Sequence, residues 1–512
     1  MSVKSDQRSV VSRWPASRAV SGRWSAVTII VAALVGVVVY LGWSATSGIW
    51  GFALDDAWIH QTYARNLVTT GQFAFVPGQP SAGSTSPLWT LLIALGYLFR
   101  ADYKLWTYAL GALCLAATAL GVWQLSLRMF PDRPRAALVA GIFCALEWHL
   151  IWAAVSGMET VLFTALSAWL SIVQYRVSGI GHSALVGVLG GLLVLTRPEG
   201  LFLIGLVWLA QIIGSGWKER ATWTHLAVVV AVMAVLLTPW LVFNWYSSGT
   251  LFPNTFYAKQ QEYAIYLSAK PLARRLMDVF VQPFIGAQVL LIPGLIVITW
   301  QLMRRLTERA TWLQLAPLAW ALAHLGLYAV RLPVTYQHGR YEMPVIPFLI
   351  LFGVMGTAML LRWNHPNLWS RVLSRAAALA TALVLLGFVA LGARAYAEDV
   401  SIIEGEMVRV ARWLATNTAP NDLIAAHDIG AIGYFAQRPL LDLAGLVSPE
   451  VIPFIRDEAQ LEALIRQRGA AHLVTFSSWY PHLAASSDLK AVFEGSARNS
   501  PDHMIVYRLP RR

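Results

Sequence analysis

Two adjacent carboxylates, Asp55 and Asp56, follow the first long apolar run and precede Trp58 and His60. Neighbouring side chains on a helix do not face each other, so the pair does not suit the two-carboxylate chemistry of a retaining glycosidase. A single general base with an orienting or metal-binding neighbour is easier to build. The structural alternative is that Asp55 caps a helix and Asp56 complements its dipole.

Basic side chains in later polar turns are the second set of chemically useful residues. Arg197 ends an apolar run beside a proline, where a buried guanidinium needs an anionic partner. Glu199 is one candidate partner and a substrate phosphate is another. For Lys259 and Arg331, snorkelling toward lipid headgroups is an equally good explanation. The candidate phosphate-binding residues are Arg197, Lys259, His338 and Arg340.

His60 and Trp58 lie within one helical turn of Asp56 and have two interpretations each. His60 could share a proton or a metal ion with Asp56, but no complete ligand set with metal-site spacing is visible. The sequence therefore leaves open a divalent metal ion held by oxygen ligands, and it indicates no other cofactor. Trp58 is typical of a membrane-interface anchor, and stacking on a sugar ring is the alternative.

The elements that must position these residues are membrane helices. The chain has 512 residues, of which 57% are hydrophobic and 13% charged, and its apolar runs repeatedly reach spanning length. The net charge of +12 lies mainly in short loops and at the N-terminus, so membrane topology explains it and nucleic acid is excluded as a partner. Cys114 and Cys144 lie inside apolar runs, which argues against a disulfide framework or a thiolate metal site.

The distribution of basic residues predicts the topology. Residues 1–24 read as a cytoplasmic tail and 26–43 as an uncleaved anchor. Basic clusters fall on the cytoplasmic side only if the short run 88–99 does not fully cross, which gives eleven crossings and places the C-terminus outside. The other predicted segments are 105–127, 135–154, 160–176, 184–196, 198–213, 223–245, 285–302, 313–330, 342–361 and 376–394.

The composition changes to that of a soluble domain after Ala395. We therefore predict a transmembrane domain at 25–395, with a first outer loop at about 50–87, and a small extracytoplasmic α/β domain at 396–512. The predicted strands and helix of the small domain are 423–426, 473–476, 504–509 and 457–468. A short helix at 56–70 should end at Gly71 and lie at the interface.

The motifs together resemble a known superfamily. Asp55-Asp56-Ala-Trp58-Ile, Tyr63-Ala-Arg65-Asn66 and Gly83-Ser-Thr85-Ser86-Pro87 resemble the first outer loop of GT-C superfamily glycosyltransferases. The closest likeness is to the mycobacterial terminal arabinofuranosyltransferase-like branch, and protein mannosyltransferases are more distant. The resemblance covers roughly 26–360, where later segments are similar in order and spacing: Ser156-Gly-Met-Glu159-Thr160, Arg197-Pro-Glu199-Gly, Pro253-Asn254-Thr-Phe-Tyr-Ala-Lys259 and His338-Gly-Arg340-Tyr341.

This resemblance implies an α-helical polytopic enzyme that transfers a sugar, with inversion, from a polyprenyl-phosphate donor. The acceptor would be an envelope glycan, lipid or protein on the outer face of the cytoplasmic membrane, with membrane lipids around the enzyme. Asp55 would be the base, Asp56 would orient the acceptor or bind a metal ion, and Arg197, Lys259 and Arg340 would neutralise the departing phosphate. The candidate substrate-binding residues are Trp58, His60, Arg65, Glu159, Glu199, Asn254 and Tyr341.

Two other functions fit a many-helix membrane protein. A transporter or flippase of a lipid-linked saccharide would place charged residues near the midplane between pseudo-symmetric repeats, whereas these motifs cluster at one face. A scaffold that has lost activity would not need the intact acid pair.

The segment from Asp428 to Leu446 has two interpretations. It forms turn structure, or it contacts the substrate.

Overall fold

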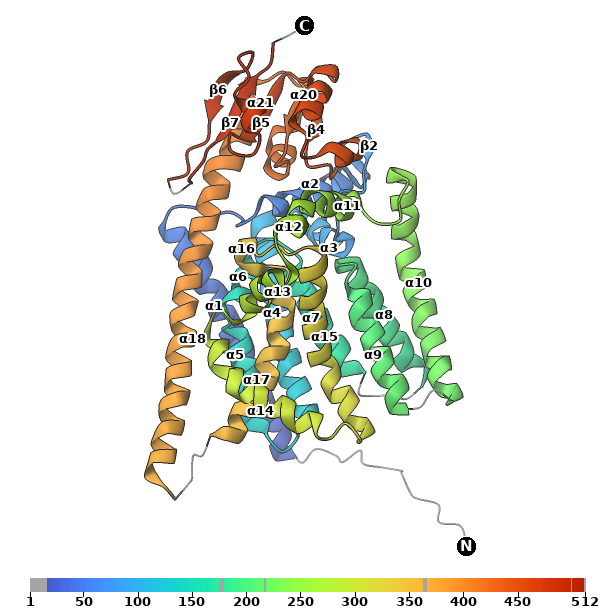
Figure 1. The fold of residues 1–512 in the computed structure, drawn as a ribbon, viewed down its shortest axis with the longest axis vertical. Coiled ribbons are helices and arrows are strands. Elements are labelled where there is room, and N and C mark those ends of the chain that lie inside the picture. Colours follow the sequence, from blue (N-terminus) through green and yellow to red (C-terminus); the bar gives the residue numbers. More distant parts are fainter. Residues whose placement is uncertain (1–15, 175–178, 216–217, 362–365, 499, 511–512) are drawn as a thin grey trace.

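The computed structural model describes residues 16–174, 179–215, 218–361, 366–498 and 500–510. The fold is a long helical bundle with a small mixed sheet at one end (Figure 1). We refer to the end of the bundle beneath the sheet as the site end. Most of the predicted tail at 1–24 lies outside the described residues, and helix α1 begins at Ala16.

Long apolar helices form the bundle. Among the described residues, six helices are long and apolar enough to cross a membrane, or eight if each of two bent pairs is one span. The chain is therefore a membrane protein, and the count of eleven crossings stays a prediction because it also needs shorter apolar helices to cross. The bundle helices are α1 (Ala16–Thr46), α4 (Tyr103–Met129), α5 (Pro134–Ala145), α6 (Trp148–Val155), α7 (Thr160–Val173), α8 (Ile180–Thr196), α9 (Gly200–Ser215), α10 (Arg220–Ser248), α13 (Leu272–Val281), α14 (Ile292–Met303), α15 (Arg309–Arg331), α17 (Ile346–Leu360) and α18 (Leu368–Ile403).

Small residues bring the central helices into backbone contact. A methyl group added at Gly111 of α4 would lie 1.8 Å from the carbonyl oxygen of Ala154, and one at Gly356 of α17 equally close to that of Gly294. Such close approach is a common way to pack helices in lipid, where van der Waals contact replaces the hydrophobic effect as the driving force. Helix α17 is buried almost all round, so it forms the centre of the bundle.

Short elements cover the site end of the bundle. Helix α2 begins at Asp55, one residue before the predicted start, and ends with Gly71 in the left-handed conformation at a φ of 71°, which confirms the predicted stop. Helix α2 is buried along most of its length. It lies under the residues after Ile403, which we call the C-terminal segment. The elements here are α2 (Asp55–Thr70), β1 (Ala74–Val76), β2 (Gln79–Pro80), α3 (Pro87–Leu98), α11 (Asn254–Glu262), α12 (Ala264–Ala269) and α16 (Tyr336–Gly339). With 12 residues, α3 is too short to span about 30 Å of hydrocarbon.

Helix α18 connects the bundle to the sheet. It runs without a break through Ala395, so the change in composition falls inside one helix. A π-helical turn, Glu404–Val408, continues into α19 (Arg409–Asn417). The sheet has the order β4-β3-β5-β7-β6, in which β3 is parallel to β4 and β5, and β7 is antiparallel to β5 and β6. Its elements are β3 (Ile424–Ala426), β4 (Leu440–Asp442), β5 (His472–Phe476), β6 (Lys490–Glu494), β7 (Met504–Arg508), α20 (Glu458–Gln467) and α21 (Pro481–Ala484).

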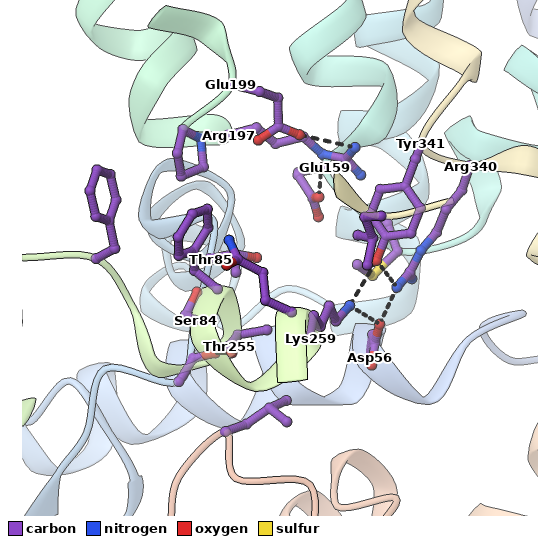
Figure 2. Close-up of a pocket in the computed structure, with 18 of the residues that line it drawn as sticks. Asp56, Ser84, Thr85, Glu159, Arg197, Glu199, Thr255, Lys259, Arg340 and Tyr341 are labelled. Atoms are coloured by element: carbon purple, nitrogen blue, oxygen red, sulfur yellow. Dashed lines mark hydrogen bonds and ion pairs between the residues drawn. The ribbon is translucent and has the colours of Figure 1, made fainter. Parts of the chain in front are cut away.

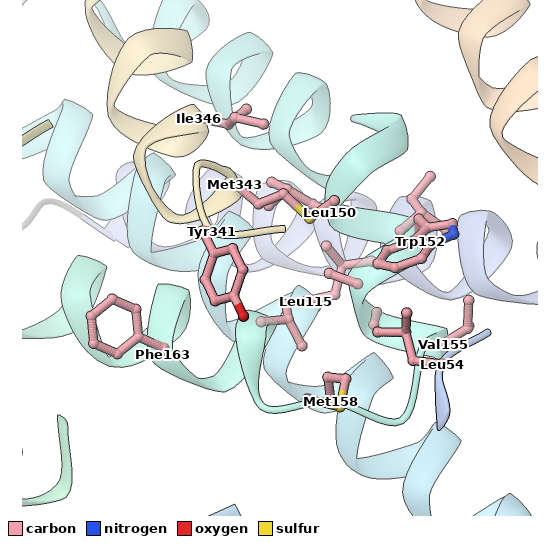
Figure 3. Packing of buried hydrophobic residues seen from close by; sticks show 14 of the residues in the cluster. Leu54, Leu115, Leu150, Trp152, Val155, Met158, Phe163, Tyr341, Met343 and Ile346 are labelled. Carbon is pink, nitrogen blue, oxygen red and sulfur yellow. The ribbon is translucent and has the colours of Figure 1, made fainter. Parts of the chain in front are cut away.

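A tightly packed apolar cluster supports the turns at the site end (Figure 3). Leu115 of α4, Leu150 and Trp152 of α6 and Phe163 of α7 surround the turns that carry Met158 and Tyr341. These side chains are almost completely buried. This packed cluster holds the turns and their polar residues in place, because densely packed interiors resist rearrangement.

Candidate active site

A cavity of about 370 Å³ opens at the site end and collects residues from widely separated parts of the chain (Figure 2). Helices α2 and α11, the turns before α7, α9 and α17, and Leu446 of the C-terminal segment contribute to it. Four cations and three carboxylates are among its lining residues: Arg197, Lys259, Arg331 and Arg340, and Asp56, Glu159 and Glu199. The loop between β2 and α3 adds the hydroxyl side chains of Ser84 and Thr85.

Asp56 is the carboxylate that faces the cations. Arg340 Nη2 donates a hydrogen bond to Asp56 Oδ2 at 2.6 Å, and Lys259 Nζ lies 3.7 Å from the same oxygen. Burial alone would raise the pKa of Asp56, but the charges of Lys259 and Arg340 hold it below its usual range. Asp56 is therefore an ionised, cation-bound carboxylate in this state.

Three of the four cations, Arg197, Lys259 and Arg340, surround Tyr341. Lys259 Nζ and Arg340 Nη2 donate to its hydroxyl oxygen at 2.8 and 3.0 Å, and the Arg197 guanidinium lies 5.4 Å from the ring centroid. Arg197 also donates from Nε to Glu159 Oε1 at 2.8 Å. This arrangement concentrates positive charge on one wall of the cavity.

Several of these buried donors have no hydrogen-bond acceptor among the described residues. Nε and Nη1 of Arg340 have none, and Nη1 of Arg197 has only an ion pair with Glu199 Oε1 at 3.8 Å, the partner that the sequence suggested. Leaving such a group unsatisfied costs about 1–3 kcal/mol, and more when it is charged. The wall therefore has unused hydrogen-bonding capacity that suits an oxyanion with several acceptor atoms.

A strained turn presents Arg340 to the cavity. Gln337 and His338 have φ values of 54° and 58°, and Gly339 follows at 68°. His338 Nε2 and Trp152 Nε1 each lie 2.8 Å from Asp399 Oδ2 of α18. His338 lines neither this cavity nor its neighbour, contrary to its predicted phosphate contact, because it is bound to Asp399.

Asp55 points away from the first cavity, because adjacent side chains on a helix diverge by about 100°. Both of its carboxylate oxygens accept backbone N–H groups, from Gly430 at 2.7 Å and Ala431 at 2.8 Å. Burial and the nearby charge of Asp428 raise the pKa of Asp55 to about 8. The resemblance implies Asp55 as the base and Asp56 as its orienting or metal-binding neighbour, and the structure places Asp56, not Asp55, against the cations. Asp55 caps a helical turn, but one that belongs to the C-terminal segment.

A second cavity of about 530 Å³ adjoins the first, between α2, α11 and the C-terminal segment. Asp56, Lys259 and Arg340 line both cavities. Within the ranges that the structure describes, no three His, Cys, Asp or Glu side chains come together as a metal site. The described residues thus assemble no donor set of this kind for the divalent ion.

The predicted substrate-binding residues divide into two groups. His60, Glu159, Glu199 and Tyr341 line the first cavity. His60 Nδ1 lies 2.9 Å from Thr90 Oγ1 and its Nε2 lies 3.5 Å from Glu159, while Glu199 accepts a hydrogen bond from Tyr328.

The other three, Trp58, Arg65 and Asn254, line neither cavity and instead contact the C-terminal segment. Trp58 is completely buried, with Phe435 at 4.8 Å between ring centroids, so it cannot stack on a sugar. Arg65 donates to the carbonyl oxygen of Tyr434 at 2.6 Å, and Asn254 to that of Leu446 at 3.3 Å. All three residues join the bundle to the C-terminal segment.

Sequence reasoning missed several lining residues. Tyr328 lies within an apolar helix and carries no motif, and Glu262 follows the Lys259 motif by three positions. Asp428 begins the segment for which turn structure and substrate contact were the alternatives, and His427 directly precedes it. Only the pairing of that segment with α2 places them beside Asp56.

The C-terminal part of the chain matches one family model, a domain of unknown function (DUF8728), over residues 395–507. The search of curated proteins gave no match. The solved structures gave clear matches at low sequence identity.

Three of these similar structures cover most of the chain. The apo oligosaccharyltransferase of Archaeoglobus fulgidus is 13% identical over 95% of this chain and 74% of its own, with a TM-score of 0.61. The same organism's oligosaccharyltransferase AglB, in complex with an inhibitory peptide and a dolichol-phosphate, is 12% identical over 89% and 70%, with a TM-score of 0.58. ArnT from Cupriavidus metallidurans, bound to undecaprenyl phosphate, is 18% identical over 96% and 98%, with a TM-score of 0.58.

At these identities the likeness establishes architecture. The expected architecture is confirmed, whereas membership of the GT-C superfamily and of its arabinofuranosyltransferase-like branch stays a prediction. The chain has the fold of these oligosaccharyltransferase and ArnT structures.

Proposed function

We propose that this protein is an integral-membrane glycosyltransferase that takes its sugar from a polyprenyl-phosphate donor. The observation that carries the proposal is the wall of buried guanidinium N–H groups without acceptors, from Arg197 and Arg340, next to the ionised Asp56. A phosphate offers the oxygen atoms that those donors lack. The neighbours crystallised with dolichol-phosphate and undecaprenyl phosphate support a lipid phosphate as the ligand.

The apolar wall of the cavity suits a prenyl chain. It includes side chains from α9, α11 and α15 and from the residues that precede α11 and follow α15: Leu201, Phe252, Phe256, Leu327 and Leu332. Leu201 is 47% exposed on the side of the bundle, so this wall extends to the lipid-facing surface. A ligand with a phosphate head and a hydrocarbon tail would bury each part against matching chemistry.

In the proposed reaction, an acceptor hydroxyl oxygen attacks the anomeric carbon as the bond from that carbon to the phosphate oxygen breaks. The acceptor proton passes to Asp56, and the polyprenyl phosphate leaves with its charge neutralised by Arg197, Lys259 and Arg340. Attack from the face opposite the phosphate gives inversion. A phosphate that engages Lys259 and Arg340 also weakens their hold on Asp56, which raises its basicity when donor is present.

The finer assignments extend the same proposal. The sugar is an arabinofuranose if the sequence likeness to that branch extends to the donor, and the acceptor belongs to the cell envelope. The N-terminus lies in the cytoplasm, and the cavity and the sheet lie on the outer face of the cytoplasmic membrane, in agreement with the distribution of basic residues. The transporter alternative is not favoured, because the charged residues line a cavity at one end of the bundle.

Mass spectrometry of reconstituted protein tests the proposal. The protein is incubated with a panel of polyprenyl-phosphate sugars, including arabinofuranose, and with extracted envelope acceptors. The expected result is a glycosylated product that Asp56→Asn abolishes and that Glu398→Gln, in an exposed ion pair on α18, leaves unchanged. Product formation by Asp56→Asn at the rate of the parent protein would overturn the assignment of Asp56, and lipid-linked sugar moved across a bilayer without transfer would favour a flippase.

A further inference from the structure

The second cavity carries an inference about the acceptor. It shares Asp56, Lys259 and Arg340 with the first cavity, so a molecule bound in it can reach the proposed base. Its remaining wall comes largely from the C-terminal segment, including His427, Asp428 and Trp479. We propose that this cavity binds the acceptor, that the acceptor is a neutral saccharide, and that His427 and Trp479 hold it. The inference rests on the proposed transferase function.

The charges of the second cavity almost balance one another. Its lining includes four carboxyl groups, Asp55, Asp56, Glu262 and Asp428, and four basic side chains, Lys259, Arg340, His427 and Arg456. Because the pKa of Asp55 is raised to about 8, this carboxyl is mostly protonated at neutral pH, which leaves three carboxylates against four cations. A strongly charged acceptor would have to displace existing ion pairs, at the cost of leaving a partner unpaired. Hydroxyl groups both donate and accept, so a sugar can insert between these groups without removing a charge.

His427 stands at the centre of this arrangement. Its Nε2 lies 3.6 Å from Glu262 Oε1 and its Nδ1 lies 3.6 Å from Asp428 Oδ1, which is too long for hydrogen bonds. Burial alone would lower the pKa of His427, but the two facing carboxylates raise it to about 10. The charged imidazole has two N–H donors, and the carboxylates on either side are acceptors, so the row Glu262–His427–Asp428 matches a set of vicinal hydroxyls.

Aromatic side chains supply the flat surface that a sugar ring needs. The Trp479 ring centroid lies 4.7 Å from that of His427 in an edge-on arrangement, and Trp479 is 41% exposed. Tyr266, 40% exposed, lines the same cavity from α12, and Tyr263 and Tyr336 stack nearby at 5.9 Å. Large aromatic faces beside hydrogen-bonding groups bind ligands that are apolar on one face and polar at the edges.

Saturation-transfer NMR on the full-length protein in nanodiscs tests the inference. The probes are three fractions prepared from the host envelope: neutral oligosaccharides, acidic oligosaccharides and peptides. We expect transfer to the neutral fraction alone, reduced at least fivefold in His427→Gln and in Trp479→Ala. Trp369→Ala, at the far end of α18 and 71% exposed, is the matched control and should leave the signal unchanged.

A parallel measurement of undecaprenyl phosphate binding separates this inference from the proposed function. Both cavity variants should bind the lipid like the parent protein, because neither residue lines the first cavity. An unchanged saccharide signal in both variants, or transfer to the peptide or acidic fraction instead, would overturn the inference while leaving the donor site intact. Failure of the parent protein to bind undecaprenyl phosphate would instead overturn the proposed function.

Discussion

Arg340 and Asp56 are 284 positions apart in the sequence, yet Arg340 Nη2 lies 2.6 Å from Asp56 Oδ2. This contact stands where the two cavities meet, so the pair is accessible from both sides. One partner is suited to binding phosphate and the other to accepting a proton.

Loss of Arg340 should weaken binding of the lipid phosphate. We expect Arg340→Met to reduce affinity for undecaprenyl phosphate about tenfold or more, because charge-assisted hydrogen bonds contribute about 1.5–3 kcal/mol each. Native mass spectrometry measures the affinity, with undecaprenol as the ligand that lacks the phosphate. Arg394→Met, in an exposed ion pair, is the control. Equal binding of the alcohol and the phosphate by the parent protein would show that the cationic wall does not select an anion.

Arg197 and Glu159 should behave as a coupled pair. Arg197→Met leaves the buried Glu159 carboxylate without its main partner, a change that typically costs about 3–5 kcal/mol. We expect a lower midpoint of thermal unfolding, and weaker donor binding, in the single variant. Adding Glu159→Gln should recover most of the stability but not the binding. Stability losses that simply add in the double variant would mean that the two side chains do not depend on each other.

The contact of His338 with Asp399 should position Arg340 for transfer. His338→Ala removes the restraint on a turn with two non-glycine residues at positive φ, so we expect transfer to slow about tenfold or more as Arg340 moves. Gln337→Gly relieves strain at the neighbouring position and should keep both activity and stability. Initial rates of product formation measure both effects. If His338→Ala transferred sugar at the rate of the parent protein, the contact between His338 and Asp399 would not be needed to position Arg340.

Asp55 should make stability depend on pH. Its pKa is raised from the ordinary value near 3.8 to about 8, so the folded protein binds this proton more tightly than the unfolded chain does. The contribution is complete below pH 4 and is lost as the pH rises to about 8. We therefore expect the unfolding midpoint of the parent protein to fall across this range relative to that of Asp55→Asn. Parallel pH profiles for the two proteins would contradict the raised pKa.

The sequence predicted the elements whose signals are local. The apolar runs and the stop at Gly71 follow from hydropathy and from glycine at a left-handed position. Arg197 stood out because a charge at the end of an apolar run is costly, and Glu159, Lys259 and Arg340 because their polar turns were predicted on the same face. The structure brings all four to one cavity with Asp56.

The sequence could not decide which acid of the pair, Asp55 or Asp56, faces the first cavity and its cations. That depends on where the C-terminal segment docks, since Gly430 and Ala431 supply the N–H groups that bind Asp55. A methyl group at Gly430 would lie 2.0 Å from the Asp55 carbonyl oxygen, so this docking also needs glycine. The sequence could not exclude stacking of Trp58 on a sugar ring for a similar reason. The ring of Trp58 is covered by Phe435, which comes from the same distant segment.

Single-turnover transfer by Asp56→Asn and Asp55→Asn, measured side by side with a preloaded polyprenyl-phosphate sugar, tests the central claim most directly. Both variants remove one carboxylate from the same helical turn, so each is the matched control of the other. The account predicts that Asp56→Asn slows the step at least about 100-fold, the usual contribution of a general base, and that Asp55→Asn retains most of the rate. A fast step in Asp56→Asn together with a lost one in Asp55→Asn would contradict it.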